Sequence, residues 1–175
     1  MNRNSQLRRF IDILKERSLT LAFAESVTCG LAAHMLSTCK GTSDVFKGAV
    51  VCYNGKVKTG LLGVPAAMIE KYTAESRQVT TAMAMGLKKC ISADIHAAIT
   101  GLASAGASEQ PGKPVGTVFF AVIYRRKVYV SHKVFKGSPL TVRQRACVHL
   151  YGLIAKYVKS AQAARRSRVR KVGMA

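Results

Sequence analysis

The chain carries at positions 22–30 the sequence Ala22-Phe23-Ala24-Glu25-Ser26-Val27-Thr28-Cys29-Gly30. Its first residues are small and apolar, which is typical of a buried strand, and its last residues are small and include a glycine, which is typical of a turn that leads into a helix. The stretch therefore predicts a strand, a turn and a helix, with Ser26 at the end of the strand. In an open α/β sheet, ligands bind beyond the carboxyl ends of the strands, so we expect the working site at this turn.

Strand and helix patterns alternate along the rest of the chain. Apolar periodicity and turn residues predict helices at 4–17, 28–36, 56–62, 66–71, after an N-cap at Ser76, and at 141–160. They predict strands at 19–24, 48–53, 94–100, 115–124 and 127–135, the last two forming a hairpin, and a turn at 40–44. Strands that alternate with helices and end in a hairpin favour a three-layer α/β/α sandwich with a mixed sheet.

Length and hydropathy indicate one domain. The 175 residues are 49% hydrophobic, which suffices for a single sizeable core, and we place the domain at residues 1–160. No apolar run approaches the roughly 20 residues that span a bilayer, and the first residues lack an apolar signal core. We therefore expect a soluble, cytoplasmic protein without a membrane partner. Residues 161–175 are basic and lack apolar periodicity, which predicts a flexible tail.

Cysteines and histidines are scattered. The five cysteines form no Cys-x-x-Cys pair, and the four histidines show no metal-ligand spacing. We expect no disulfide framework, no metal and no cofactor.

The charge is large and uneven. The chain has 28 Lys and Arg against 8 Asp and Glu, a net charge of +20. Residues 1–109 hold 13 basic and all 8 acidic residues, whereas residues 110–175 hold 15 basic residues and no acidic one. Such a field attracts phosphates, so the charge is compatible with a nucleotide, a nucleic acid or an anionic membrane surface.

Three loops fall at the expected ligand-binding edge, around Ser26, from residue 53 to 58, and from residue 100 to 106. A serine at the start of a helix lies beside free backbone N–H groups that can bind a phosphate or an oxyanion, and a desolvated lysine such as Lys58 can accept its proton. The ordinary alternatives are a helix cap for Ser26, a solvated lysine for Lys58 and a packing aromatic for Tyr53.

Six blocks in a fixed order add a more specific signal. They are residues 21–30, Gly41-Thr42-Ser43 with Phe46, residues 48–54, Lys58 with residues 61–65, residues 98–101, and residues 113–118. Together they resemble the C-terminal domain of the competence/damage-inducible CinA proteins, a family that includes stand-alone nicotinamide-nucleotide amidases. The resemblance extends from about Gln6 to Tyr157.

This resemblance implies an α/β/α fold, often dimeric, that deamidates nicotinamide mononucleotide without a metal. It implies that Ser26 is the nucleophile and Lys58 the general base, and that Ser43, Tyr53 and Thr100 line the pocket for a pyridine nucleotide. To act as a base, Lys58 must be neutral, so burial or a neighbouring positive charge must lower its pKa.

The further candidates for substrate binding come from the same two loops and from the last helix. They are Glu25, Thr28, Gly30, Gly101, Arg143 and Arg145. The two arginines are candidate clamps for the substrate phosphate, with two solvated arginines as the alternative.

Some positions depart from the family pattern. In the usual Glu-Ser-Cys-Thr-Gly-Gly motif, Val27 replaces the cysteine and Cys29 replaces the first glycine. In the usual Thr-Gly-Ile-Ala-Gly-Pro-Gly-Gly loop, Ser104-Ala105 replace Gly-Pro. The glycine before the last helix is followed by Ser138-Pro139, where the family often has an arginine two residues after this glycine. These changes keep open an alternative, a non-catalytic protein of this fold that binds a nucleotide or a nucleic acid. Nucleic-acid binding through the basic tail is the less favoured interpretation.

Overall fold

A computed structural model describes the backbone of residues 3–172 and the side chains of residues 4–161. The helices are α1 (Arg3–Lys15), α2 (Leu31–Ser37), α3 (Thr42–Val45), α4 (Gly55–Leu62), α5 (Ala66–Tyr72), α6 (Arg77–Cys90) and α7 (Pro139–Val172). The strands are β1 (Leu21–Glu25), β2 (Phe46–Val51), β3 (Ile95–Gly101), β4 (Thr117–Tyr124) and β5 (Lys127–Val134).

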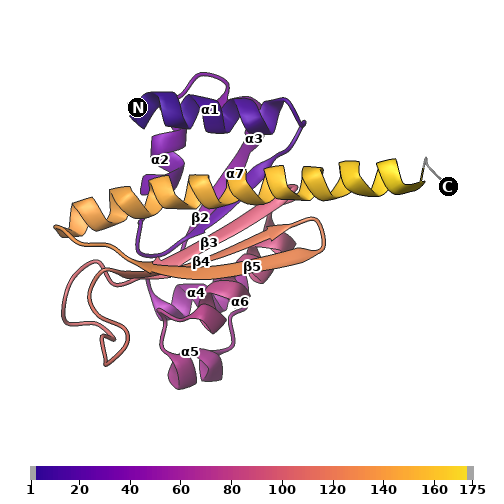
Figure 1. Cartoon of the computed structure of the whole chain (residues 1–175). Helices are drawn as coiled ribbons and strands as arrows, with labels where there is room; N and C mark the ends of the chain where they lie inside the picture. Colours follow the sequence, from indigo (N-terminus) through magenta and orange to yellow (C-terminus); the bar gives the residue numbers. More distant parts are fainter. Residues whose placement is uncertain (1–2, 173–175) are drawn as a thin grey trace.

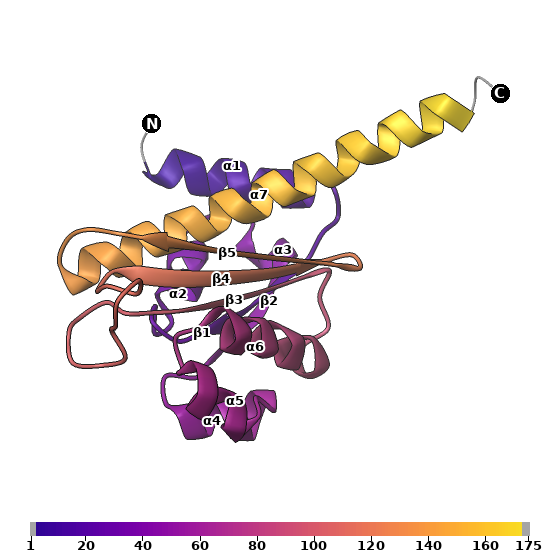
Figure 2. The same ribbon diagram turned by 60° about the horizontal axis from the view of Figure 1, so that its bottom comes forward.

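The strands form one mixed sheet in the order β2-β1-β3-β4-β5. Strand β1 is parallel to β2 and β3, whereas β4 runs antiparallel to β3 and β5. Figures 1 and 2 show α1 and α7 on one face of the sheet and α4, α5 and α6 on the other. The predicted three-layer α/β/α sandwich with a mixed sheet is confirmed.

Alternating side chains of the central strands supply a core on each face. Phe23, Ile99 and Phe120 belong to the core under α1 and α7, and Ala22 and Ala24 belong to the core under α4 and α6. The second core uses small strand residues because its helices pack closely. At Gly86 of α6, an added Cβ would lie 1.9 Å from the carbonyl oxygen of Leu62, the last residue of α4.

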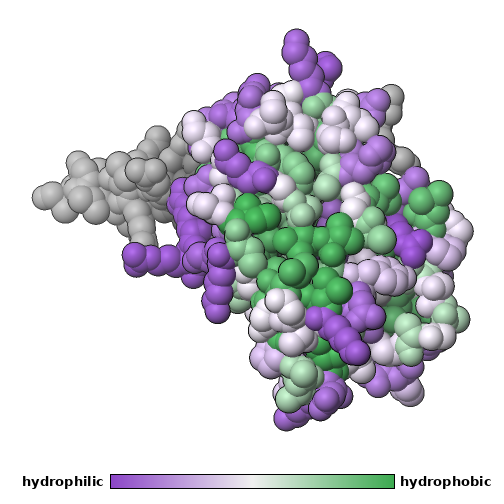
Figure 3. All heavy atoms as spheres, turned by 180° about the vertical axis from the view of Figure 1, so that it is seen from behind, coloured by the Kyte–Doolittle hydropathy of each residue, from purple (hydrophilic) through white to green (hydrophobic). Residues whose placement is uncertain are grey.

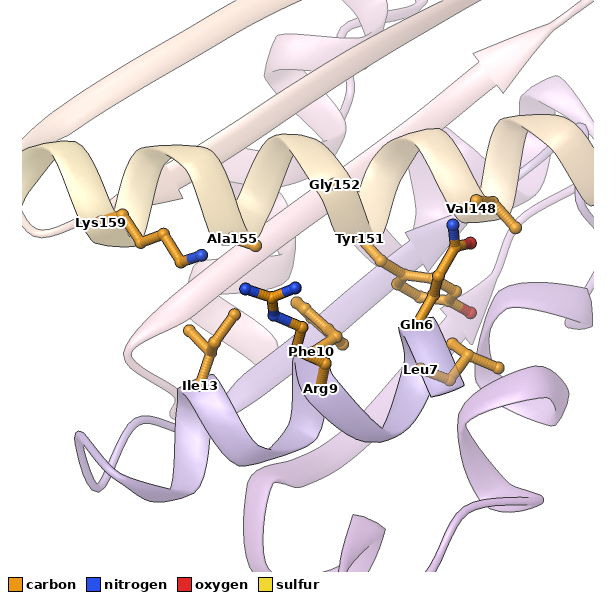
Figure 4. A pocket seen from close by; sticks show the side chains of 10 residues that line it. All are labelled: Gln6, Leu7, Arg9, Phe10, Ile13, Val148, Tyr151, Gly152, Ala155 and Lys159. Atoms are coloured by element: carbon orange, nitrogen blue, oxygen red, sulfur yellow. The ribbon is translucent and has the colours of Figure 1, made fainter. Parts of the chain in front are cut away.

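The first and last helices pack against each other. The rings of Phe10 in α1 and Tyr151 in α7 lie 5.2 Å apart, and the Tyr151 hydroxyl donates to the carbonyl oxygen of Ala32 in α2 at 2.6 Å. The two long helices border a cavity of about 290 Å³ whose lining includes Leu7 and Ile13 (Figure 4). None of the predicted site residues lines this cavity, which places the predicted site elsewhere.

Several local predictions hold and others need correction. The hairpin turns at Arg125 and Arg126, and Ser76 caps α6 by accepting from the Val79 N–H at 3.3 Å. Residues 42–45 form the short helix α3 where we expected a turn. Helix α2 begins at Leu31 instead of residue 28, because Cys29 and Gly30 both have a left-handed backbone, with φ of 48° and 89°.

The last helix is longer than predicted. It does not end near Ser160 but continues to Val172, and Figures 1 and 2 show it projecting past the sheet. Its continuation is rich in alanine, arginine and lysine, which are good helix formers even without apolar periodicity. Part of the predicted tail therefore has a helical backbone, and residues 173–175 lie outside the described chain. No described helix is long and apolar enough to cross a membrane.

Candidate active site

Ser26 and Lys58 lie in contact at the carboxyl end of β1. The Ser26 Oγ and the Lys58 Nζ are 3.1 Å apart, and the two residues are 4% and 0% exposed. Ser26 directly follows β1, and Lys58 lies in the first turn of α4, whose start is capped by the Asn54 side chain. The predicted pairing across 32 residues of sequence is therefore present in the structure.

The other partners of Lys58 are backbone carbonyls. Its Nζ lies 2.9 Å from the carbonyl oxygen of Cys52 and 3.2 Å from that of Tyr53. An ammonium group has three N–H donors, whereas a neutral amine has two donors and one lone pair. In the neutral form, both donors can serve the carbonyls and the lone pair can accept the Ser26 hydroxyl proton. The three contacts thus suit a base directed at Ser26.

Burial favours that neutral form. Removal from water lowers the pKa of Lys58, and the charges of Cys52 and Glu75 act in the opposite direction. Burial also raises the pKa of the Cys52 thiol to about 11, so at neutral pH this thiol carries no charge. Of Cys52 and Glu75, only Glu75 then carries a negative charge that favours the protonated form of Lys58.

Glu25 organises the turn that carries Ser26. Its fully buried carboxylate accepts from the Thr28 hydroxyl at 2.7 Å and from three backbone N–H groups, those of Gly30, Ala32 and Ala33, at 2.9–3.0 Å. The carboxylate therefore occupies the positive end of α2. The N–H groups of Gly30, Ala32 and Ala33 are therefore not free, contrary to our expectation for this helix start. The structure favours positioning roles for Glu25, Thr28 and Gly30, and their contact with substrate stays a prediction.

Two other N–H groups of the turn are available. Among the hydrogen bonds of the described residues, none uses the N–H of Val27 or of Thr28. Both follow Ser26 directly, which makes them candidate donors to an oxyanion formed at this serine.

Thr100 lies next to Ser26 on the neighbouring strand. The Ser26 N–H donates to the Ile99 carbonyl at 3.0 Å, which extends the pairing of β1 with β3. The hydroxyls of Thr100 and Thr80 are 2.7 Å apart, and Thr80 donates its proton to the Ser76 carbonyl, so Thr100 is the donor to Thr80. The Thr100 hydroxyl is thus oriented by Thr80 of α6, and its oxygen keeps lone pairs that can accept a hydrogen bond.

Gly101 has a packing explanation. A Cβ at this position would lie 2.6 Å from the carbonyl oxygen of Thr117 and 2.8 Å from the Cα of Val118. Its lack of a side chain permits β4 to approach β3. Its predicted contact with substrate remains a prediction.

The structure separates the remaining candidates. The backbone carbonyl of Tyr53 contacts Lys58, and the residue is 63% exposed.

Ser43 is exposed in α3, before the amino end of β2. Ser26 follows the carboxyl end of β1, so within one chain these two serines lie at opposite ends of the parallel strands. The structure therefore does not bring Ser43 to the pair.

The two arginines of α7 also differ in position. The Arg143 Nε donates to the Val27 carbonyl at 2.8 Å, which joins α7 to the Ser26 turn. The Arg145 Nη1 donates to the Lys136 carbonyl at 2.6 Å, after β5. Arg143 is therefore the better candidate for a phosphate clamp.

A second polar cluster, which the sequence did not predict, lies near Lys58. Lys113, in the loop between β3 and β4, donates to Thr73 Oγ1 at 2.7 Å and to Ser108 Oγ at 2.9 Å. Ser108 in turn donates to a Glu75 carboxylate oxygen at 2.5 Å. No local pattern pointed to this cluster, because its members come from separate loops. The family block that begins at Lys113 was the one available signal.

A mixed α/β/α sheet with a buried serine–lysine contact at its carboxyl edge defines the class of protein. The chain belongs to the CinA C-terminal domain family, whose model matches residues 4–158.

Curated relatives agree with this assignment. A CinA-like protein of Petrotoga mobilis is 38% identical over 149 residues, which cover 85% of this chain and 36% of that protein. A putative competence-damage inducible protein of Moorella thermoacetica is 40% identical over 126 residues, covering 72% of this chain and 30% of that protein. The chain thus spans only about a third of the length of these relatives.

Solved structures share the fold over their whole length. A CinA superfamily protein from Klebsiella pneumoniae has a TM-score of 0.85 at 27% identity, with 91% of this chain and 99% of that chain covered. A competence or damage-inducible protein from Enterobacter asburiae has a TM-score of 0.83 at 27% identity, with 90% and 99% covered.

Proposed function

We propose that this chain is an amidohydrolase that converts nicotinamide mononucleotide into nicotinic acid mononucleotide and ammonia. The observation that carries the proposal is the buried contact between Ser26 and Lys58, in which the other two lysine contacts are uncharged carbonyls. The class of substrate comes from the resemblance to the nicotinamide-nucleotide amidases of the CinA family.

The reaction follows from the placement of these two groups. The Ser26 Oγ attacks the carboxamide carbon while its proton passes to the Lys58 Nζ. The resulting oxyanion is stabilised by the N–H groups of Val27 and Thr28. When the C–N bond breaks, Lys58 returns the proton to the departing nitrogen, and ammonia leaves an acyl ester on Ser26. Lys58 then takes a proton from water, whose oxygen attacks the ester, and Ser26 recovers its proton as the acid is released.

Substrate binding uses the side of the turn near α7. Within the Arg143 guanidinium, the Nε donates to the Val27 carbonyl, and the terminal N–H groups have no hydrogen bond among the described residues. These terminal groups can therefore bind the substrate phosphate. The net charge of +20 attracts the same phosphate over a longer range.

A homodimer remains part of the proposal. Strand β2 is an edge of the sheet, and its last residue, Val51, is 43% exposed. Figure 3 shows apolar side chains gathered in a patch on the face opposite to that of Figure 1. Sheet edges and exposed apolar patches are surfaces that proteins commonly cover. Light scattering on the purified chain measures the oligomeric state, and a Val51→Lys variant should shift it toward the monomer.

The catalytic proposal is tested by incubating the protein with nicotinamide mononucleotide. The acid product is separated by chromatography and the ammonia is measured in the same sample. The wild type should release both in equal amounts, and Ser26→Ala should release neither. Ser37→Ala is the matched control, because it removes the same hydroxyl from an exposed position of α2 that has no part in the proposed mechanism, and it should retain activity. Absence of turnover in folded wild-type protein would contradict the proposal.

A further inference from the structure

The exposed cations of β5, and those of α7 up to residue 161, form no salt bridge among the described residues. The salt bridges between described residues are Lys15–Asp44 and Arg17–Glu16, and both involve α1 or the turn that follows it. No acidic residue occurs after Glu109. The exposed cations of β5 and α7 therefore remain without a compensating carboxylate from their own segment.

Several of these cations meet in one groove. An open groove of about 790 Å³ lies between the end of β5 and the first turns of α7. Lys133, Lys136 and Arg145 line it, together with His149 and the polar side chain of Gln144. The three cations are exposed, and the contact between Arg145 and the Lys136 carbonyl fixes the position of one guanidinium. The groove thus presents fixed positive charge without a carboxylate in its lining.

The helical continuation of α7 adds to this charge. The sequence after Ser160 contains Arg165, Arg166, Arg168, Arg170 and Lys171. The backbone keeps these positions on one helix with Arg145, and Figures 1 and 2 show this helix extending past the sheet. The groove borders the first turns of α7 and the continuation is its other end, so one helix carries both basic segments of the sequence.

The apolar content of the α7 continuation favours a nucleic acid over a membrane. A helix that lies on a lipid surface buries large apolar residues such as Trp, Phe or Leu in the acyl region. Between residues 161 and 172, the apolar residues are only alanines and valines. Phosphate groups of a nucleic-acid backbone require cations and no such apolar face.

We infer that the groove between β5 and α7, with the basic continuation of α7, binds the phosphate backbone of nucleic acid without reading its sequence. Arg145 then contacts a phosphate of this polymer and not the phosphate of the mononucleotide. Neither Ser26 nor Lys58 lines the groove, so this function is independent of the amidase.

The test measures binding of the full chain to a fluorescently labelled DNA duplex of arbitrary sequence. Anisotropy gives the dissociation constant at several KCl concentrations, and each phosphate contact adds about 0.9 to the slope of log K against log salt. A variant with Lys133→Gln, Lys136→Gln and Arg145→Gln should reduce this slope by about 3. A second variant with glutamine at the five basic positions from Arg165 to Lys171 should reduce it further.

The matched control removes the same charge elsewhere. Lys47, Lys88 and Lys89 are exposed on β2 and at the end of α6, and their replacement by glutamine should leave the slope near that of the wild type. Equal losses in the groove variant and this control would overturn the inference, because the attraction would then be diffuse. Failure of the wild type to bind the duplex at low salt would also overturn it, as would binding to anionic phospholipid vesicles alone. None of these results depends on amidase activity.

Discussion

Two buried lysines of this molecule each contact a serine, yet their surroundings differ. Lys58 contacts Ser26 and two carbonyl oxygens, and the lysine contact is the one hydrogen bond of the Ser26 hydroxyl among the described residues. Lys113, which is 7% exposed, contacts Ser108, whose hydroxyl proton is already donated to the Glu75 carboxylate.

This difference separates a base from a structural cation. Burial lowers the pKa of both lysines, and the charge of Glu75 acts against that shift at both; at Lys113 a second carboxylate, Glu109, acts in the same direction as Glu75. Ser108 can only accept from Lys113, because its own proton is used. Ser26 keeps a proton that Lys58 can accept. A contact between a serine and a lysine is therefore not enough to indicate a nucleophile and its base. The other hydrogen-bond partners of the two side chains decide whether the lysine can accept the serine proton.

The largest expected effect comes from removing each amine. Lys58→Met should lower the turnover of nicotinamide mononucleotide by about a thousandfold or more, because the general base is lost. Lys113→Met should lower it by less than about tenfold, because that lysine touches no reacting atom in the proposed mechanism. Steady-state kinetics on folded proteins measures both. Equal losses would remove the distinction between the two lysines.

Stability should respond to Lys113. The Lys113→Met variant loses the hydrogen bond to Thr73, which ties the β3–β4 loop to the segment before α6, and the hydrogen bond to Ser108 within the loop. We expect its free energy of unfolding to fall by about 2 kcal/mol. Urea denaturation measures this change. Lys89→Met, at an exposed position, serves as control and should change stability by less than about 0.5 kcal/mol.

The pH dependence of turnover should report the charge on Glu75. Turnover rises with pH as Lys58 loses its proton, and the negative charge of Glu75 raises the pKa of Lys58. Glu75→Gln removes that charge, so the rising limb should move to lower pH. Lys113→Met leaves the Glu75 charge less compensated, so the limb should move to higher pH. Shifts in the same direction for both variants would contradict this electrostatic account.

The smallest effect is expected at the second serine. Ser108→Ala loses one hydrogen bond to Glu75 and one from Lys113, which should cost about 1 kcal/mol of stability. Turnover should stay within about threefold of the wild type, since Ser108 is not the nucleophile. Thermal unfolding and ammonia release measure the two quantities. A loss of turnover comparable to that of Ser26→Ala would assign the chemistry to the wrong serine.

Local patterns predicted the elements well but not all their limits. The alternation of apolar and turn residues gave every strand and the long helices, because burial imposes periodicity on neighbouring residues. It missed the start of α2, since the left-handed backbone at Cys29 leaves no apolar signature. It also missed the continuation of α7, because an exposed helix needs no apolar stripe.

The sequence by itself determined the fold class, the uneven charge and, through the order of the family blocks, the pair of Ser26 and Lys58. Only the tertiary structure decided what each polar residue contacts. It assigned Glu25 to the start of α2, placed Ser43 at the far end of the parallel strands and brought Lys113 to Ser108 and Glu75. The physical reason is range: periodicity reflects burial of residues close in sequence, whereas desolvation and hydrogen bonding depend on partners that meet only when the chain is folded.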